Sequence, residues 1–185
     1  MKSARVILII LLLVATVLGW RVFSRRSVIL RKHPAGIVIH HTATPPAVQG
    51  KPIDVASIDS AHARRGFAVT DDDGQTYHIG YHYLVLQDGT VLPGRPEHLR
   101  GAHAKGHADT IGIALVGDFE RASNRGRSGP LAPTPAQLRA LTELTRQLMR
   151  KYRLPVSSVQ LHRELGQTAC PGDGFPQAAF YRALR

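Results

Sequence analysis

The stretch GIVIH, residues 36–40, is an apolar run that ends on a histidine. A short uncharged run of this kind is typical of a buried β-strand. Similar runs recur in TIGIALV at residues 110–116 and in VQLH at residues 159–162. Helical patterns lie between these runs, at residues 55–65 and 134–152. Strands interleaved with helices predict an α/β fold: a single domain with a central mixed β-sheet flanked by helices.

Turn and capping residues set the limits of several elements. Asp88-Gly89 separates YHYLVLQ from TVLP, which predicts a β-hairpin. Thr134 suits a helix N-cap, Pro135 suits the first helical position, and Gln137 completes a capping box. The apolar stripe of this helix is expected to pack against the core. It comprises Leu138, Leu141, Leu144, Leu148 and Tyr152.

Three stretches predict irregular structure. Residues 42–52 contain three prolines and are expected to form a loop. Residues 71–74, DDDG, predict a solvated turn, and residues 123–133, rich in Gly, Ser and Arg, predict a flexible surface loop. The last expected element is a terminal helix at residues 177–184.

The basic charge is concentrated at the N-terminal end. The formal net charge is +11, but seven of the 24 basic residues precede His33, and the first acidic residue is Asp54. The remainder has 17 basic and 13 acidic residues, so the globular part is only mildly basic. Without an aromatic-rich basic stripe, this composition does not argue for a nucleic-acid partner.

Residues 6–20, VILIILLLVATVLGW, are an apolar run preceded by Lys2 and Arg5. A basic segment followed by an apolar one is typical of a secretory signal, but no clear cleavage site follows it. The run is slightly short for a full span, and extension through Phe23 would help. We therefore expect residues 1–23 to be a signal anchor forming a transmembrane helix, residues 24–35 a basic juxtamembrane linker, and residues 36–185 the globular domain.

The orientation of this anchor is set by two conflicting signals. More basic residues follow the apolar run than precede it, and the positive-inside rule then favours a cytoplasmic domain. The function that the motifs described below indicate favours the other side of the membrane. We give the function more weight and expect a membrane-anchored domain on the periplasmic, or extracytoplasmic, side.

Cys170 is the only cysteine, so it cannot form an internal disulfide. It is a buried small residue, a reactive thiol or a metal ligand. Its setting favours a ligand, because TACPG is a turn-forming stretch and because His40 and His162 each close an apolar run. Two imidazoles and one thiolate, with a fourth position for water, are the ingredients of a catalytic zinc centre.

An ordered series of motifs resembles a known family. IVIHHTAT, IGYHYLVLQDGTVLPGR, GAHAKGH, TIGIALVGDF, TPAQLRALTELTRQL and LHRELGQTACPG occur in the order seen in zinc-dependent N-acetylmuramoyl-L-alanine amidases. The branch is the one that contains bacteriophage T7 lysozyme and the peptidoglycan recognition proteins. The resemblance runs from about Gly36 to the C-terminus, and the N-terminal anchor lies outside it.

The resemblance implies which residues bind the metal and which act beside it. His40, the first histidine of the HH pair, His162 and Cys170 would hold Zn²⁺, and His162 precedes Cys170 by the eight residues typical of the family. Tyr81 matches the family's catalytic tyrosine, whose hydroxyl orients the water or donates to the oxyanion. Thr168 is the second catalytic candidate. The phage amidase has a lysine at this position, whereas threonine can donate a hydrogen bond but supplies no positive charge.

Three further residues are expected to bind substrate: His41, Thr42 and His103. His41 follows His40 on an extended segment and should point to the opposite face, which argues against two neighbouring ligands. The resemblance places His103 on the substrate cleft, where it would bond a muropeptide. His98 and His107 are better explained as solvated loop residues than as a second metal site, because glycines interrupt their spacing.

The implied reaction is hydrolysis of the amide between N-acetylmuramic acid and L-alanine in peptidoglycan. Zinc would lower the pKa of a bound water to about 7 and polarise the amide carbonyl. Cys170 must be a thiolate to coordinate the ion. Glu164 is interpreted as a solvated carboxylate.

The sequence leaves other functions open. The chain could be a peptidoglycan-binding module without activity, but proteins of the family that only bind typically lack the cysteine. It could be a polyanion-binding membrane protein that uses residues 21–32, although that segment is more simply a contact with lipid headgroups. It could also be an amidase that recycles muropeptide fragments in the cytoplasm. Its oligomeric state cannot be predicted from the sequence.

Overall fold

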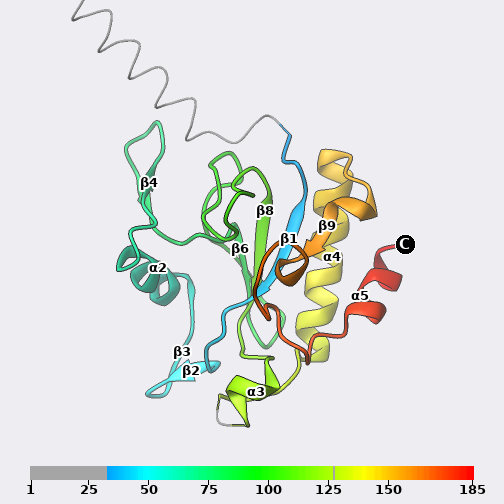
Figure 1. Ribbon diagram of the computed structural model, residues 1–185. Helices are drawn as coiled ribbons and strands as arrows, with labels where there is room; N and C mark the ends of the chain where they lie inside the picture. The colour runs from blue at the N-terminus through cyan, green and yellow to red at the C-terminus, as the bar shows by residue number, and fades with distance from the viewer. Residues whose placement is uncertain (1–32, 127) are drawn as a thin grey trace, which may run out of the picture.

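A five-stranded sheet with β1 near its centre organises the computed structural model, which describes residues 33–126 and 128–185 (Figure 1). The strand order is β7-β6-β8-β1-β9. The strands are β1 (Ile37–His41), β6 (Tyr83–Val85), β7 (Val91–Pro93), β8 (Ile111–Leu115) and β9 (Val159–Leu161).

The sheet is mixed, as the sequence predicts. β1 pairs in parallel with both β8 and β9, and β6 pairs in parallel with β8. β6 and β7 form the expected antiparallel hairpin around Asp88-Gly89. Every residue of β1 and β8 is buried. Strands covered on both faces need no polar side, which explains the uninterrupted apolar runs in the sequence.

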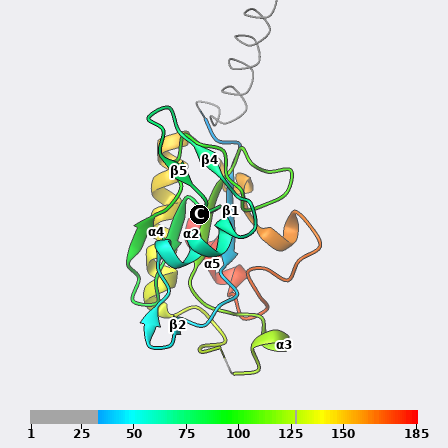
Figure 2. The same cartoon turned by 90° about the vertical axis from the view of Figure 1, so that its left-hand side faces the viewer.

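Helices cover the two faces of the sheet (Figures 1 and 2). α4 (Pro135–Tyr152) and α5 (Gln177–Leu184) lie on one face, where Ile113 belongs to the core cluster that also holds Leu141 and Phe180. α2 (Val55–Ala63) lies on the other face, where Ala114, the residue after Ile113 in β8, belongs to a smaller cluster with Ile58. Successive side chains of a strand point to opposite faces, so one buried strand supplies both clusters.

The start of α4 has the predicted capping box. The Gln137 backbone N–H donates to Thr134 Oγ1 at 3.0 Å, and the Thr134 N–H donates to Gln137 Oε1 at 3.1 Å. Pro135 occupies the first turn, where a missing N–H costs nothing. Gln137 is fully buried, and its amide also donates to the Val116 carbonyl at 2.9 Å. The cap therefore fixes the helix to the end of β8 as well as starting it.

Two small hairpins occupy stretches that the sequence predicts as loops and turns. One is formed by β2 (Ala47–Val48) and β3 (Lys51–Pro52), and the other by β4 (Val69–Thr70) and β5 (Thr76–Tyr77) around the DDDG turn. A strand of two residues is too short to show alternation, so its sequence gives no strand signal. The remaining short elements are α3 (Arg121–Asn124), η1 (Val156–Ser158) and η2 (His162–Glu164).

The expected signal anchor at residues 1–23 and most of the expected linker at residues 24–35 lie outside the described residues. Within residues 33–126 and 128–185, no helix has the length and apolar character needed to cross a bilayer. The anchor therefore stays a prediction.

Candidate metal centre

Two neighbouring parallel strands bring the predicted histidine ligands together. β1 and β9 pair with Ile39 opposite Leu161, so the next residue along each strand is a histidine at the same edge of the sheet. His40 is the fourth residue of β1, and His162 begins η2 directly after β9. Their ring centroids are 4.5 Å apart. Distant segments therefore meet here because their strands have the same direction.

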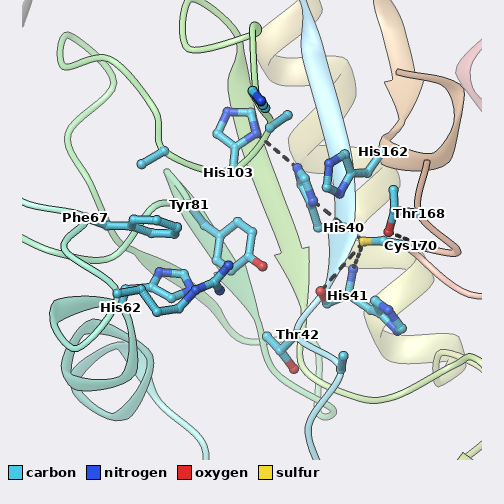
Figure 3. A pocket seen from close by; sticks show the side chains of 15 residues that line it. His40, His41, Thr42, His62, Phe67, Tyr81, His103, His162, Thr168 and Cys170 are labelled. Atoms are coloured by element: carbon cyan, nitrogen blue, oxygen red, sulfur yellow. Dashed lines mark hydrogen bonds between the residues drawn. The ribbon is translucent and has the colours of Figure 1, made fainter. Parts of the chain in front are cut away.

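Cys170 completes the cluster from the loop that follows η2 (Figure 3). Its Sγ lies 3.6 Å from His40 Nδ1, and one ligand atom from each of the three residues lies within 4.8 Å of the others. The His41 backbone N–H points at the same sulfur at 3.4 Å. Cys170 is only 9% exposed, so the sulfur forms part of the floor of the cleft.

The loop that presents Cys170 is held by neighbouring backbone groups. The Arg163 N–H donates to the Cys170 carbonyl at 2.8 Å, and the Arg163 guanidinium donates to the Gly172 carbonyl at 2.8 Å. Thr168 Oγ1 accepts from the Cys170 N–H at 3.2 Å. The position of the sulfur is therefore fixed from both sides.

The donor set and its spacing suit zinc. Zinc binds imidazole nitrogen at about 2.0–2.1 Å and thiolate sulfur at about 2.3 Å, so a tetrahedral ion separates these two atoms by about 3.6 Å. The distance between His40 Nδ1 and Cys170 Sγ has that value. Two nitrogens and one sulfur leave a fourth position, as in catalytic zinc sites. A zinc ion therefore fits these three residues.

Burial prepares the two imidazoles as ligands. It lowers the pKa of His40 well below its ordinary value, and the neighbouring His103 and His162 lower it further. The pKa of His162 is also lowered, first by burial and then by the charge of His107. Both rings are therefore neutral at pH 7, with a nitrogen lone pair available for a metal.

Burial has the opposite effect on the thiol. It raises the pKa of Cys170 to about 12, although the His41 N–H and the charge of Arg163 act in the opposite direction. Without a cation the residue is a thiol at neutral pH, and a metal must displace its proton.

The cluster lies in a cleft with a volume of about 570 Å³. None of the described residues that line the cleft is acidic, and two are basic, Arg65 and Lys105. The full lining comprises His40, His41, Thr42, Ala43, His62, Arg65, Phe67, Tyr81, Ala102, His103, Ala104, Lys105, His162, Thr168 and Cys170. All eight residues predicted as ligands, catalytic groups or substrate contacts therefore border one cleft.

The Tyr81 ring packs between two histidines on the wall of the cleft. Its centroid lies 5.2 Å from that of His40 and 5.3 Å from that of His62, and its hydroxyl points toward the His40–Cys170 pair (Figure 3). Burial raises the pKa of the phenol, with a further contribution from Cys170. Tyr81 therefore keeps its proton at neutral pH and faces the metal site as a hydrogen-bond donor.

His41, expected to bind substrate, turns its ring away from the metal site. Its Nδ1 accepts from the Phe119 N–H at 3.1 Å and lies 3.9 Å from Asp118 Oδ1. The predicted alternation of His40 and His41 is confirmed. The His41 ring is only 6% exposed and packs on the turn after β8, so its expected contact with substrate stays a prediction. Thr42 borders the cleft and accepts from the Gly117 N–H at 3.1 Å, so its contact with substrate stays a prediction.

His103 borders the cleft, but the protein occupies both of its ring nitrogens. Nδ1 lies 3.0 Å from His40 Nε2, and Nε2 lies 3.0 Å from the Thr110 carbonyl. Burial lowers its pKa to about 3, and the nearby His82 contributes to the shift, so the ring is neutral. The expectation that His103 bonds a muropeptide through a ring nitrogen therefore does not match its contacts.

Glu164, interpreted as solvated, is exposed but has a structural role. Its carboxylate accepts from the Leu161 N–H at 2.7 Å, the Gln177 amide at 2.9 Å and the Tyr181 hydroxyl at 2.8 Å. It ties η2 to α5 and thereby supports the segment that holds His162.

Sequence reasoning missed seven residues of the cleft lining, of which four have side chains larger than alanine: His62, Arg65, Phe67 and Lys105. His62 was available in principle, because it lies four positions after Ile58 and these two are the buried residues of α2. Its Nδ1 accepts from the Gly80 N–H at 2.9 Å. Arg65 and Phe67 lie just beyond the helix, where no periodic pattern shows which way a side chain points.

A buried arginine holds this wall in place. Arg95 is 3% exposed, and its guanidinium donates to the carbonyls of Ile79 at 2.8 Å, Phe67 at 2.9 Å and Arg100 at 2.7 Å. One side chain thus links the segment after α2 with the loop that leads to His103.

Comparison with known proteins gives one consistent family. A family model described as N-acetylmuramoyl-L-alanine amidase matches residues 30–173. The chain is 32% identical over 142 residues to the endolysin of Escherichia phage T7, and the match spans 76% of this chain and 82% of the endolysin. It is 31% identical over 139 residues to a peptidoglycan-recognition protein of Drosophila melanogaster, a match that spans 74% of this chain and 67% of the relative.

Solved structures with the same fold include two from Clostridium intestinale URNW. The N-acetylmuramoyl-L-alanine amidase LysC superposes with a TM-score of 0.65 at 33% identity, covering 82% of this chain and 85% of LysC. The endolysin amidase LysCS superposes with a TM-score of 0.67 at 32% identity, covering 85% of this chain and 87% of LysCS.

Proposed function

The chain belongs to the N-acetylmuramoyl-L-alanine amidase family, and we propose that His40, His162 and Cys170 hold the zinc ion on which its activity depends. It is a peptidoglycan hydrolase that cleaves the amide between N-acetylmuramic acid and L-alanine. The observation that supports the metal proposal most directly is the convergence of two nitrogens and one sulfur within 4.8 Å on the floor of a cleft.

The residues of the cleft have separate tasks in this reaction. A bound zinc ion would supply a water with a pKa near 7 and a Lewis acid for the amide carbonyl. Tyr81 presents a protonated hydroxyl on the side of the cluster, where it can donate to the carbonyl oxygen as negative charge develops there. Thr168 holds the backbone N–H of Cys170 and thus the position of the sulfur. Its role is therefore one of placement as much as of direct catalysis.

The charge of the cleft supports a muropeptide as the substrate. Arg65 and Lys105 border it, and no described acidic residue does. Opposite charges across a binding surface favour the encounter, so carboxylates of a stem peptide suit this wall. The metal site then lies at the floor, where the scissile amide must reach.

Hydrolysis of intact cell wall tests this proposal. Purified sacculi incubated with the full chain should release material with new L-alanine amino termini. Removal of metal with a chelator should abolish the release, and zinc should restore it. Cys170→Ser should lose zinc and activity together, while Gly166→Ala, which meets no atom within 4 Å, should keep both. Full activity in protein shown by elemental analysis to lack metal would refute the zinc assignment.

We also propose that the domain acts on the extracytoplasmic side of a membrane, anchored through residues 1–23. The apolar run at residues 6–20 and the location of peptidoglycan support this placement. A reporter active only in the cytoplasm, fused after Arg185, should stay inactive. An active reporter would instead favour an amidase that recycles soluble muropeptides, and comparison of sacculi with soluble fragments as substrates would then separate the two roles.

A further inference from the structure

The contacts of His103 form a directed chain that ends at a predicted zinc ligand. His103 Nε2 lies 3.0 Å from the carbonyl oxygen of Thr110, the residue before β8. A carbonyl oxygen can only accept a hydrogen bond, so this nitrogen must carry the proton. A neutral imidazole has one proton, which leaves His103 Nδ1 as an acceptor.

The direction then passes to His40. His103 Nδ1 lies 3.0 Å from His40 Nε2, so His40 Nε2 must be the donor and carry the ring proton. The other nitrogen of a neutral His40 is therefore bare. That atom is Nδ1, which lies 3.6 Å from Cys170 Sγ on the side of the metal site. One backbone carbonyl thus determines which nitrogen of His40 offers its lone pair.

The ring of His103 is enclosed by positions that admit no side chain. A Cβ at Gly101 would lie 2.4 Å from the His103 ring, and a Cβ at Gly112 would lie 2.5 Å from it. On a further side the ring meets His82 edge-on, with centroids 5.7 Å apart. His82 is itself fixed, since its Nδ1 accepts from the Gly112 N–H at 3.0 Å and its Nε2 donates to the Leu99 carbonyl at 3.0 Å.

The loop that supplies the acceptor is closed on itself. The Thr110 hydroxyl donates to the His107 carbonyl at 2.7 Å, and the His107 N–H donates to the Ala104 carbonyl at 3.1 Å. The Gly101 N–H donates to the Ala108 carbonyl at 2.9 Å. The carbonyl that sets the direction of the chain is therefore held rigidly relative to His103.

We propose that His103 is a positioning residue for the metal site rather than a substrate contact. It fixes the tautomer and ring orientation of His40 so that Nδ1 faces the metal. The inference rests on the proposed zinc site and deepens it. Partners of this kind, one step removed from the metal, typically change metal affinity or activity by about 10–100-fold when removed. The usual partner is a carboxylate, a backbone carbonyl or water. Here a second imidazole stands between the ligand and the carbonyl.

Two substitutions of nearly equal shape test the role. His103→Asn places an amide oxygen where Nδ1 lies, so it can still accept from His40. His103→Leu places a methyl group there. Zinc affinity, measured by competition with a chromophoric chelator, should fall about 10–100-fold in His103→Leu and by much less in His103→Asn. The Co²⁺-substituted protein should show an altered ligand-field spectrum only in His103→Leu.

A second measurement needs neither metal nor activity. Two-bond ¹⁵N–¹H correlation spectra of the metal-free wild type report which nitrogen of each histidine is protonated. His40 and His103 should both appear as the Nε2–H tautomer. In His103→Leu, His40 should become a mixture of tautomers, with thermal unfolding recorded to show that the variant is folded.

The possible results separate this proposal from the metal assignment. An Nδ1–H tautomer for His40 in the wild type would overturn the proposal. Unchanged zinc affinity in His103→Leu together with a raised KM would also overturn it, because that result would identify His103 as a substrate contact. If the wild type bound no zinc at all, the metal assignment would fail and the positioning role with it, whereas an Nε2–H tautomer of His40 in the metal-free protein would still establish the hydrogen-bond chain from Thr110.

Discussion

Zinc binding should release one proton from Cys170, and this sets how metal affinity depends on pH. Burial raises the pKa of the Cys170 thiol to about 12, which is more than five units above pH 6.5. At this pH the metal must therefore displace a firmly bound proton. At about 1.4 kcal/mol per unit, that step costs about 7 kcal/mol of the intrinsic binding free energy. Burial lowers the pKa values of both histidines, so they release less proton than the thiol on binding metal.

Below about pH 7, where a zinc-bound water would keep its protons, affinity should therefore rise about tenfold for each pH unit, because one proton is released for each ion bound. Isothermal titration calorimetry of the metal-free protein in buffers with different ionisation enthalpies counts the released protons directly. Cys170→His is the control, since a neutral imidazole can bind metal without losing a proton. The ultraviolet absorbance of a thiolate should appear at pH 6.5 only when zinc is added.

Two results would contradict this reasoning. Equal proton release by the wild type and Cys170→His would show that the thiol does not supply the proton. Affinity that stays constant from pH 6 to pH 8 would show that the sulfur is already a thiolate, or that it is not a ligand.

Three other perturbations give distinct expectations. Tyr81→Phe should slow turnover about 10²–10³-fold while zinc content is unchanged, if its hydroxyl serves the developing oxyanion; unchanged turnover would remove Tyr81 from the reaction. Burial lowers the pKa of His82 from 6.5 to about 4, so the unfolded state takes up a proton before the folded state as pH falls. Chemical denaturation should therefore show that the unfolding free energy decreases by about 3 kcal/mol between pH 7 and pH 4 because of this residue, and the decrease should be absent in His82→Gln. Leu141→Ala should lower the unfolding free energy by about 2–5 kcal/mol, measured by urea denaturation, because its side chain is fully buried; a smaller loss would mean that the core closes around the gap.

The large elements of the fold could be predicted because their signals are local. The buried runs of β1 and β8 and the capped, periodic sequence of α4 each identify an element from neighbouring residues alone. The parallel direction of β1 and β9 is not local, although the alternation of strands and helices favours it. The two-residue strands were missed because so few residues cannot show a period.

The site was predictable in its components and not in its connections. The three clustered side chains followed from motif order. The role proposed for His103 depends on a contact between residues 63 positions apart and on a carbonyl in an irregular loop. No spacing rule identifies such a partner. Arg95 is a similar case. Its guanidinium donates to backbone carbonyls, which every residue has, so no acidic partner in the sequence indicates its role.

The separation of the proposed zinc ligands along the chain has a consequence for how the enzyme matures. His40 and Cys170 are 130 residues apart, and only the assembled β1–β8–β9 core brings them together. An unfolded polypeptide does not hold all three side chains around one point, so the complete site exists only in the finished fold. Metal at a concentration a thousand times its dissociation constant would then raise the unfolding free energy by about 4 kcal/mol. Zinc supply would thus govern the lifetime of this hydrolase as well as its catalytic competence.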